Sequence, residues 1–171
     1  MLSGNKLGAV GLLIADALTG AMGEASPSAA ALLLSLRYHP DLTATELAKV
    51  AGIAQPTATR VIDGLVRRGW LERGSREGRT TQLRLTAPGR KQARALQTAR
   101  LKAMRRLLDL VPAAERRAFE RACDAILAEA TTSRAFARTT CRLCDHAVCD
   151  GPLCPAGTRA TQLERMETKA D

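Results

Sequence analysis

Aromatic residues are nearly missing from this 171-residue sequence, in which tryptophan, tyrosine and phenylalanine together make up 2%. Proteins that bind single-stranded nucleic acids stack the bases on aromatic side chains, so this scarcity argues against that class. Histidine occurs only twice, as His39 and His146, and neither belongs to a recognisable catalytic constellation. We therefore expect a protein without catalytic residues, and not an enzyme.

Long apolar segments and scattered cysteines are missing as well. No apolar run approaches the ~20 residues that span a bilayer, so we expect no membrane partner. Lys6 and the apolar residues after it resemble an export signal, but Asp16 interrupts that pattern and the apolar spacing continues to Met22, as in an amphipathic helix. Only Cys123 lies outside residues 141–154, which argues against a disulfide framework. These features predict a cytoplasmic protein.

The charge of the sequence is strongly positive and unevenly distributed. Lysine and arginine number 26 against 17 acidic residues, which gives a net charge of +9. Residues 41–100 alone carry a net charge of +7, whereas residues 141–171 carry a net charge of −1. Because basic surfaces attract polyanions, we expect the surface that binds nucleic acid to lie within residues 41–100.

The spacing of apolar residues predicts a mainly α protein with one small β-hairpin. Apolar positions three and four residues apart, with Ser, Thr, Pro and Gly at the ends of the segments, indicate helices. Two short segments near the middle of the chain indicate the strands of a hairpin, joined by a loop over residues 74–80. The predicted helices cover residues 6–24, 27–38, 44–51, 55–68, 86–111 and 112–131, and the strands cover residues 70–73 and 82–85.

Two of these helices form the pattern of a helix-turn-helix, whose second helix enters the major groove of DNA. A Thr-x-x-Glu capping box opens helix 44–51, and Gly52 separates it from helix 55–68. The hairpin after them forms a wing whose arginines can reach phosphates or a narrow minor groove. Such elements also occur in other folds, but their coincidence with the basic segment favours DNA binding. The candidate DNA-binding residues are Thr43, Thr45, Gln55, Pro56, Thr57, Thr59, Arg60, Arg76 and Arg79.

Residues 42–90 resemble the winged helix-turn-helix of the MarR family of bacterial transcriptional regulators. The resemblance is carried by ELA and GI in the first helix and turn, TATRVIDGL in the recognition helix, RGWLER, the wing GRTTQLRLT, and APGR at the start of the next helix. It implies a homodimer that binds a pseudo-palindromic DNA operator, and a small-molecule effector bound between the winged helix and the dimerisation helices. Two residues depart from the family pattern: Ala54 replaces a capping serine, and Glu77 replaces an aspartate of the wing.

The resemblance also divides the chain into regions. Residues 1–40 and 86–131 would form a helical dimerisation region, and residues 41–90 a winged helix-turn-helix that binds double-stranded DNA. The apolar positions of helix 86–111 need an apolar partner, which independently supports dimerisation. The expected C-terminal region, residues 132–171, consists of a linker, a cysteine-rich metal-binding module and a polar tail, at residues 132–140, 141–155 and 156–171.

Four cysteines gather in the C-terminal module with the spacing C-x2-C-x4-C-x4-C: Cys141, Cys144, Cys149 and Cys154. Four thiolates this close can surround one Zn²⁺ ion tetrahedrally, and the module has too few apolar residues to fold unaided. An iron–sulfur cluster is the main alternative, although the spacing differs from the ferredoxin pattern, and a dithiol redox switch is the third interpretation. Zinc would favour a structural clip, whereas an iron–sulfur cluster would make the segment a sensor.

The predicted function is therefore that of a homodimeric, sequence-specific regulator of transcription, acting as a repressor, with a C-terminal four-cysteine metal site. The alternative is an iron–sulfur or thiol-based regulator whose switch is the segment from Cys141 to Cys154. An RNA-binding knuckle protein is disfavoured, because residues 141–171 are acidic on balance and contain no aromatic residue. We expect His146 to be a solvated loop residue rather than a fifth ligand.

Overall fold

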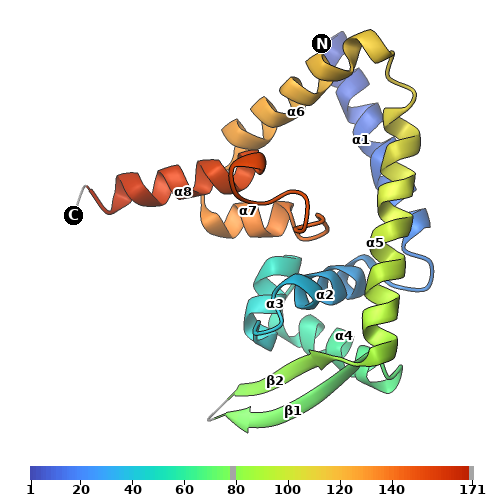
Figure 1. Cartoon of the computed structure of the whole chain (residues 1–171), viewed down its shortest axis with the longest axis vertical. Helices are drawn as coiled ribbons and strands as arrows, with labels where there is room; N and C mark the ends of the chain where they lie inside the picture. The colour runs from blue at the N-terminus through green and yellow to red at the C-terminus, as the bar shows by residue number, and fades with distance from the viewer. Residues whose placement is uncertain (78–79, 170–171) are drawn as a thin grey trace.

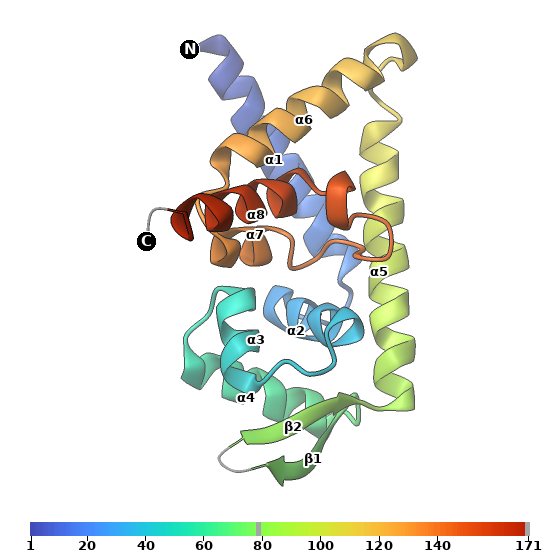
Figure 2. The same ribbon diagram turned by 60° about the vertical axis from the view of Figure 1, so that its left-hand side comes forward.

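The structure, a computed structural model, describes residues 1–77 and 80–169, which form a helical protein with one antiparallel hairpin (Figure 1). This architecture confirms the predicted fold class. The hairpin lies at one end of the molecule, and α1 and α6 lie toward the other (Figures 1 and 2). The helices are α1 (Leu2–Ala21), α2 (Pro27–Tyr38), α3 (Ala44–Ala51), α4 (Gln55–Arg67), α5 (Ala87–Leu108), η1 (Ala113–Glu115), α6 (Arg116–Ala130), α7 (Arg134–Thr140), η2 (Gly151–Leu153) and α8 (Pro155–Glu167), and the strands are β1 (Leu71–Glu77) and β2 (Thr80–Leu85).

Helix α2 forms the centre of the main core. Its residues from Ala29 to Leu36 are all buried, and the helix packs against α3, α4, β2 and α5. The Ser26 hydroxyl caps the helix by accepting a hydrogen bond from the Ala29 N–H, and Pro27 occupies the first turn. Helix α2 therefore packs with the elements of the winged helix as well as with α5.

Helices α3 and α4 form the predicted helix-turn-helix. The Thr43 hydroxyl caps α3 by accepting from the Glu46 N–H at 3.3 Å, while the Glu46 carboxylate accepts from the Thr43 N–H at 2.8 Å. Gly52 ends α3 with a φ of 67°, in the left-handed region that favours glycine. Ala54 offers no side-chain cap to α4, so its departure from the family pattern leaves the first N–H groups of that helix without this acceptor.

The hairpin extends further toward its tip than the sequence predicts. Strands β1 and β2 pair antiparallel from Leu71, which lies opposite Leu85. The register shifts between Arg73 and Arg76, as it does at a β-bulge. Most of the expected loop therefore belongs to the strands. The alternation of polar and apolar residues does not reveal this, because the register shift interrupts it.

Helix α5 connects the winged helix to the opposite end of the molecule (Figure 1). The Thr86 hydroxyl caps it by accepting from the Gly89 N–H at 3.0 Å, and the Thr86 N–H donates to the Trp70 carbonyl at 3.2 Å. Gly89 lies directly against that carbonyl, since a Cβ atom at this position would be 1.8 Å from the Trp70 oxygen. The close approach of the two backbones therefore requires glycine.

Helices α1 and α6 present large apolar side chains to solvent. Every residue of both helices is exposed or half-buried, although α1 contacts α5 and α6 contacts α8. The side chains of Leu7, Leu12 and Leu13 in α1 are 63%, 71% and 52% exposed, and Ile126 in α6 is 56% exposed. Exposed apolar side chains in this number are typical of helices that contact a partner. Across residues 1–77 and 80–169, no helix has both the length and the apolar character to cross a bilayer.

The C-terminal region is more helical than its sequence predicts. The expected linker contains α7, which the Ser133 hydroxyl caps by accepting a backbone N–H. The expected polar tail forms α8, which the Cys154 sulfur caps in the same way at 3.2 Å. The expected linker and tail thus contain helices. These helices pack around a second small core, which the local spacing of residues does not reveal. Its buried residues are Ala137, Ala156 and Ala160.

Candidate nucleic-acid interface and cysteine cluster

The N-terminal half of α4 presents polar side chains away from the core. Ala58, Ile62 and Leu65 are buried on one side of the helix. Glutamine and arginine on the other side match the edges of adenine and guanine, and threonine can contact phosphate or the thymine methyl. The exposed residues are the predicted Gln55, Pro56, Thr57, Thr59 and Arg60.

The other predicted DNA contacts differ in whether their side chains are free to reach DNA. The Thr43 hydroxyl donates to Glu46 Oε2 at 2.7 Å, so it is committed to the capping box, whereas Thr45 is exposed. The hydrogen bonds from the Thr43 N–H and hydroxyl lower the pKa of Glu46. The backbone of Arg76 belongs to β1, but its side chain and the whole of Arg79 lie outside the described residues.

Ion pairs and hydrogen bonds position the hairpin against the helices beside it. Arg73 of β1 forms an ion pair with Asp63 of α4. Arg90 of α5 donates to the carbonyl oxygen of Leu85, at the end of β2, at 2.7 Å. These contacts order the hairpin relative to both the exposed face of α4 and the start of α5.

A cleft of about 700 Å³ opens between the end of α2, the hairpin and α5. Its size falls within the range of small-molecule sites. Asp41 and Glu72 are the acidic residues of its lining, and basic residues outnumber them. The cleft therefore suits an anionic ligand better than a cationic one. Its basic residues are Arg37, Arg84, Arg90 and Arg94.

The four C-terminal cysteines converge beside the core between α7 and α8. Cys141 shares hydrogen bonds with Cys144 and Cys154, and Cys149 shares one with Cys154. All four are half-buried free thiols. The four cysteines of the predicted module thus lie near one another.

The packing of the thiols separates their pKa values. The hydrogen bond from Cys141 lowers the pKa of Cys144 to about 6, with the charge of Arg100 acting in the same direction and burial opposing it. The same hydrogen bond, followed by burial, raises the pKa of Cys141. Burial raises the pKa of Cys149 to about 11. Of these three thiols, Cys144 therefore forms a thiolate most readily.

The cysteines lie near one another without completing a metal geometry. In the part of the chain that the structure describes, no group of three or more His, Cys, Asp or Glu side chains could hold a metal ion as it stands. Four sulfur donors nevertheless match the chemistry of a structural zinc site. His146 hydrogen-bonds with His39 and with the Cys141 carbonyl oxygen, so its ring nitrogens are engaged elsewhere.

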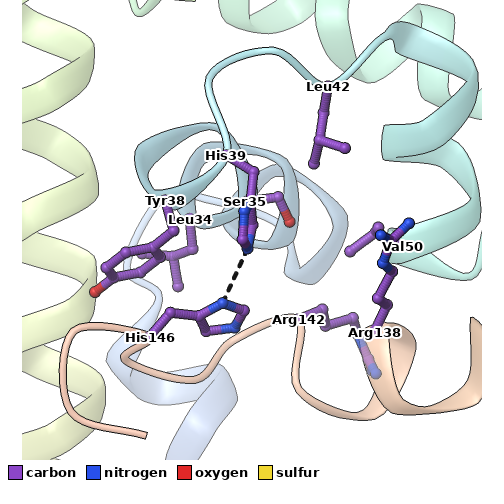
Figure 3. A pocket seen from close by; sticks show the side chains of 9 residues that line it. All are labelled: Leu34, Ser35, Tyr38, His39, Leu42, Val50, Arg138, Arg142 and His146. Atoms are coloured by element: carbon purple, nitrogen blue, oxygen red, sulfur yellow. Dashed lines mark hydrogen bonds between the residues drawn. The ribbon is translucent and has the colours of Figure 1, made fainter. Parts of the chain in front are cut away.

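The loop that carries the cysteines docks on the end of α2. The Tyr38 hydroxyl donates to Asp145 Oδ1 at 2.6 Å, and the Tyr38 ring stacks on His146 with 5.2 Å between centroids. His39 Nε2 and His146 Nδ1 are 3.0 Å apart, across the hydrogen bond drawn in Figure 3. A pocket of about 100 Å³ lies at this junction of α2, α3 and α7. Burial and the Asp145 hydrogen bond raise the pKa of Tyr38 to about 12.

Two further contacts join this region to α3 and α5. The Thr139 hydroxyl donates to the Lys49 carbonyl at 3.2 Å. Gln97 of α5 is 3% exposed and, in the amide orientation that satisfies its neighbours, its oxygen accepts from the Asp145 N–H at 3.2 Å. Sequence reasoning missed Tyr38, Gln97 and Thr139, because their partners are distant in the chain and no local pattern marks them.

Comparisons with known proteins show that this chain is similar to regulators of the MarR family. Residues 26–78 match the model of the MarR family. The MarR family protein Rv2887 of Mycobacterium tuberculosis is 26% identical over 72% of this chain and 92% of its own, with a TM-score of 0.61. Rv2887 has also been crystallised with DNA and with salicylic acid. A comparison with curated protein sequences finds no significant match.

Two other solved structures show the same fold at lower identity. MepR, a transcription regulator of the Staphylococcus aureus multidrug efflux pump MepA, is 17% identical over 75% of this chain and 98% of its own, with a TM-score of 0.64. MarR of Escherichia coli is 22% identical over 72% of this chain and 96% of its own, with a TM-score of 0.62. The winged helix of this chain is therefore similar to that of the MarR family, whose model matches residues 26–78.

Proposed function

We propose that this chain is a regulator of transcription that binds double-stranded DNA through α4 and the hairpin, and that it is not an enzyme. The exposed polar face of α4 carries the proposal, because it lies in the segment that matches the MarR family and within residues 41–100, whose net charge is +7. The DNA complex of Rv2887 supports the same role for a similar fold. In this role the start of α4 enters the major groove and the hairpin follows the adjacent backbone.

The proposed regulator is a homodimer. The apolar side chains of α1 and α6 lie toward the end of the molecule opposite the hairpin, where a second copy would cover them (Figure 1). Burial of such surface contributes about 25 cal/mol per Å². A two-fold axis there would place two recognition helices ~34 Å apart, one turn of DNA, so the operator is a pseudo-palindrome. We propose a repressor, because a dimer that covers its operator keeps other proteins from that DNA.

Binding to duplexes selected from a random pool tests this function. Fluorescence anisotropy at several salt concentrations measures affinity for the selected inverted repeat, and sedimentation measures the mass of the free protein. Arg60→Ala should weaken binding by about 5- to 150-fold if its guanidinium contacts a guanine. Arg165→Ala removes the same charge from α8 and should leave affinity unchanged. A monomer without preference for any duplex, or equal binding by the two variants, would contradict the proposal.

We also propose that a small anionic effector binds in the cleft between α2, the hairpin and α5. The four arginines of its lining favour a carboxylate. The crystal structure of Rv2887 with salicylic acid supports a ligand of this kind. A molecule that contacts both α2 and α5 would shift operator affinity by favouring one arrangement of these elements. Calorimetric titration with salicylate as the probe tests the cleft, and a titration without heat or change in DNA affinity would count against it.

We further propose that the four cysteines bind one Zn²⁺ ion. The convergence of four half-buried thiols supports this site, and thiolate coordination would replace the hydrogen bonds between them. Elemental analysis should find zinc in the purified chain and in Cys123→Ser, whose change lies in α6, but not in Cys144→Ser. Visible absorbance in anaerobically purified protein would identify an iron–sulfur cluster instead. Metal-free protein with reversibly oxidised cysteines would favour the thiol switch.

A further inference from the structure

We propose that the thiophilic metal ion is an effector of this regulator, because binding it fixes residues 139–146 as a clasp across α2, α3 and α5. This inference rests on the proposed DNA-binding function and metal site, and it adds that the second controls the first. The effector class is a cation that prefers sulfur ligands, and Zn²⁺ serves as the probe.

Two of the four proposed metal ligands lie within the clasp. Cys141 and Cys144 lie within the clasp, and each residue that anchors it to the winged helix is at most two positions from one of them. A change in the positions of the sulfur atoms therefore changes the positions of the anchors. The anchoring residues are Thr139, Asp145 and His146.

The anchors reach both sides of the junction between the winged helix and α5. On the winged helix, Tyr38 of α2 donates to the Asp145 carboxylate at 2.6 Å, and the Lys49 carbonyl of α3 accepts from Thr139 at 3.2 Å. On the other side, Gln97 of α5 accepts from the Asp145 N–H at 3.2 Å. Gln97 directly follows Leu96, a residue of the main core, so the clasp meets α5 where that helix packs on the winged helix (Figure 2).

The clasp also contacts the turn of the helix-turn-helix. The Thr139 methyl group is 3.4 Å from the position that a Cβ atom would take at Gly52. Gly52 ends α3 and is followed three residues later by the start of α4. A displacement of α7 and the clasp would therefore act directly on the element that orients the recognition helix.

The clasp has little apolar packing of its own to maintain its shape. The buried residues of the C-terminal core are three alanines, Ala137, Ala156 and Ala160. Leu143 packs against the main core, so this contact also depends on the conformation of the loop. In a module with so small a core, the free energy of metal binding becomes free energy of folding. We therefore expect the metal-free clasp to open more often than the loaded one.

Zinc should raise the affinity of the dimer for an inverted repeat. With the clasp open, Thr139 no longer supports the turn at Gly52, so the two recognition helices match both half-sites less often. A duplex with one half-site needs only one helix, so its binding should change little. We expect a gain of about 10-fold for the inverted repeat, within the ~5- to 150-fold range of allosteric couplings.

The test compares full-length protein stripped by a chelator with the same protein reloaded with Zn²⁺. Thr139→Val and Tyr38→Phe each remove one anchoring hydroxyl without changing a cysteine. Both should bind zinc with wild-type stoichiometry and lose most of the gain in affinity. Thr168→Val is the matched control, because its hydroxyl donates to the Glu164 carbonyl at the end of α8, away from the clasp, and it should keep the full gain.

Amide hydrogen exchange gives a readout that does not require DNA. Zinc should slow exchange in residues 39–53 of the wild type, and should slow it less in Thr139→Val. If zinc binds but changes neither this exchange nor DNA affinity, the clasp is wrong while the DNA-binding function and metal site stand. If exchange slows and no duplex binds, the clasp stands and the proposed function fails. If zinc does not bind, the metal site and the clasp both fail.

Discussion

Replacing Gly89 by alanine tests the junction between the wing and α5. The new Cβ atom would lie 1.8 Å from the Trp70 carbonyl oxygen, a backbone atom that cannot rotate away. Overpacking costs about 1–3 kcal/mol, and the weakened hydrogen bond from Thr86 to this carbonyl adds about 1 kcal/mol. The lower entropy of the unfolded variant returns about 0.4–1 kcal/mol. The expected net loss of about 2 kcal/mol lowers Tm by roughly 4–8 °C for a chain of this size.

Gly64→Ala provides the matched control for this measurement. Gly64 lies in α4, and the nearest neighbour of its added Cβ would be the Arg67 guanidinium at 3.9 Å, which is ordinary contact. Removing glycine from a helix interior without a clash should raise stability by up to about 1 kcal/mol. Thermal unfolding followed by circular dichroism compares the two variants. Equal or reversed shifts in Tm would refute the close approach between α5 and the strand end.

Three further measurements each test one feature. Ala54→Ser supplies the missing side-chain cap of α4 and should stabilise the protein by about 1 kcal/mol in thermal melts. The pKa of Glu46 lies below its ordinary value of 4.5 in the folded protein. Its contribution to the free energy of unfolding is therefore present above pH 4.5 and is lost as the pH falls through the folded pKa. Glu46→Gln should flatten that part of the acid-unfolding curve. Tyr38 is the only tyrosine, so ultraviolet titration of the folded protein should give a pKa near 12, and an ordinary value of 10 would show that its contact with Asp145 does not form in solution.

The helix-turn-helix could be predicted almost to the residue, because interactions within one turn determine its ends. Ser26 with Pro27 opens α2, the Thr43 capping box opens α3, and Gly52 closes it. Helices α2 and α3 therefore have the predicted bounds, and α4 ends one residue before its predicted end. In each case a residue type that suits the end of a helix stands at that end: a hydroxyl that accepts from backbone N–H groups, or a glycine that adopts a left-handed conformation. These residue types can be read directly from the sequence.

Three other helices were harder to predict. Helix α1 begins at Leu2 rather than at residue 6, and Met1 provides no side-chain cap. Helices α7 and α8 have small residues where they meet, so the apolar spacing that marks a larger core is weak. Arg134 connects them through an ion pair with Glu164, whose partners are thirty positions apart in the chain. Tertiary contacts rather than intrinsic spacing therefore specify the C-terminal helices.

The candidate sites also differ in how far apart their residues lie in the chain, and this decides which of them could be predicted. The exposed face of α4 follows from helical periodicity, and the cysteine ligand set follows from spacing, because each involves residues close together in the chain. The contact between Tyr38 and Asp145 joins residues 107 positions apart, and many other hydroxyl and carboxylate groups could have paired instead. The stacking of Tyr38 on His146 and the burial of Gln97 select this pair only after α2 and α5 have packed. Sequence spacing can thus single out the four cysteines, whereas the folded structure shows which helices contact the segment that carries them.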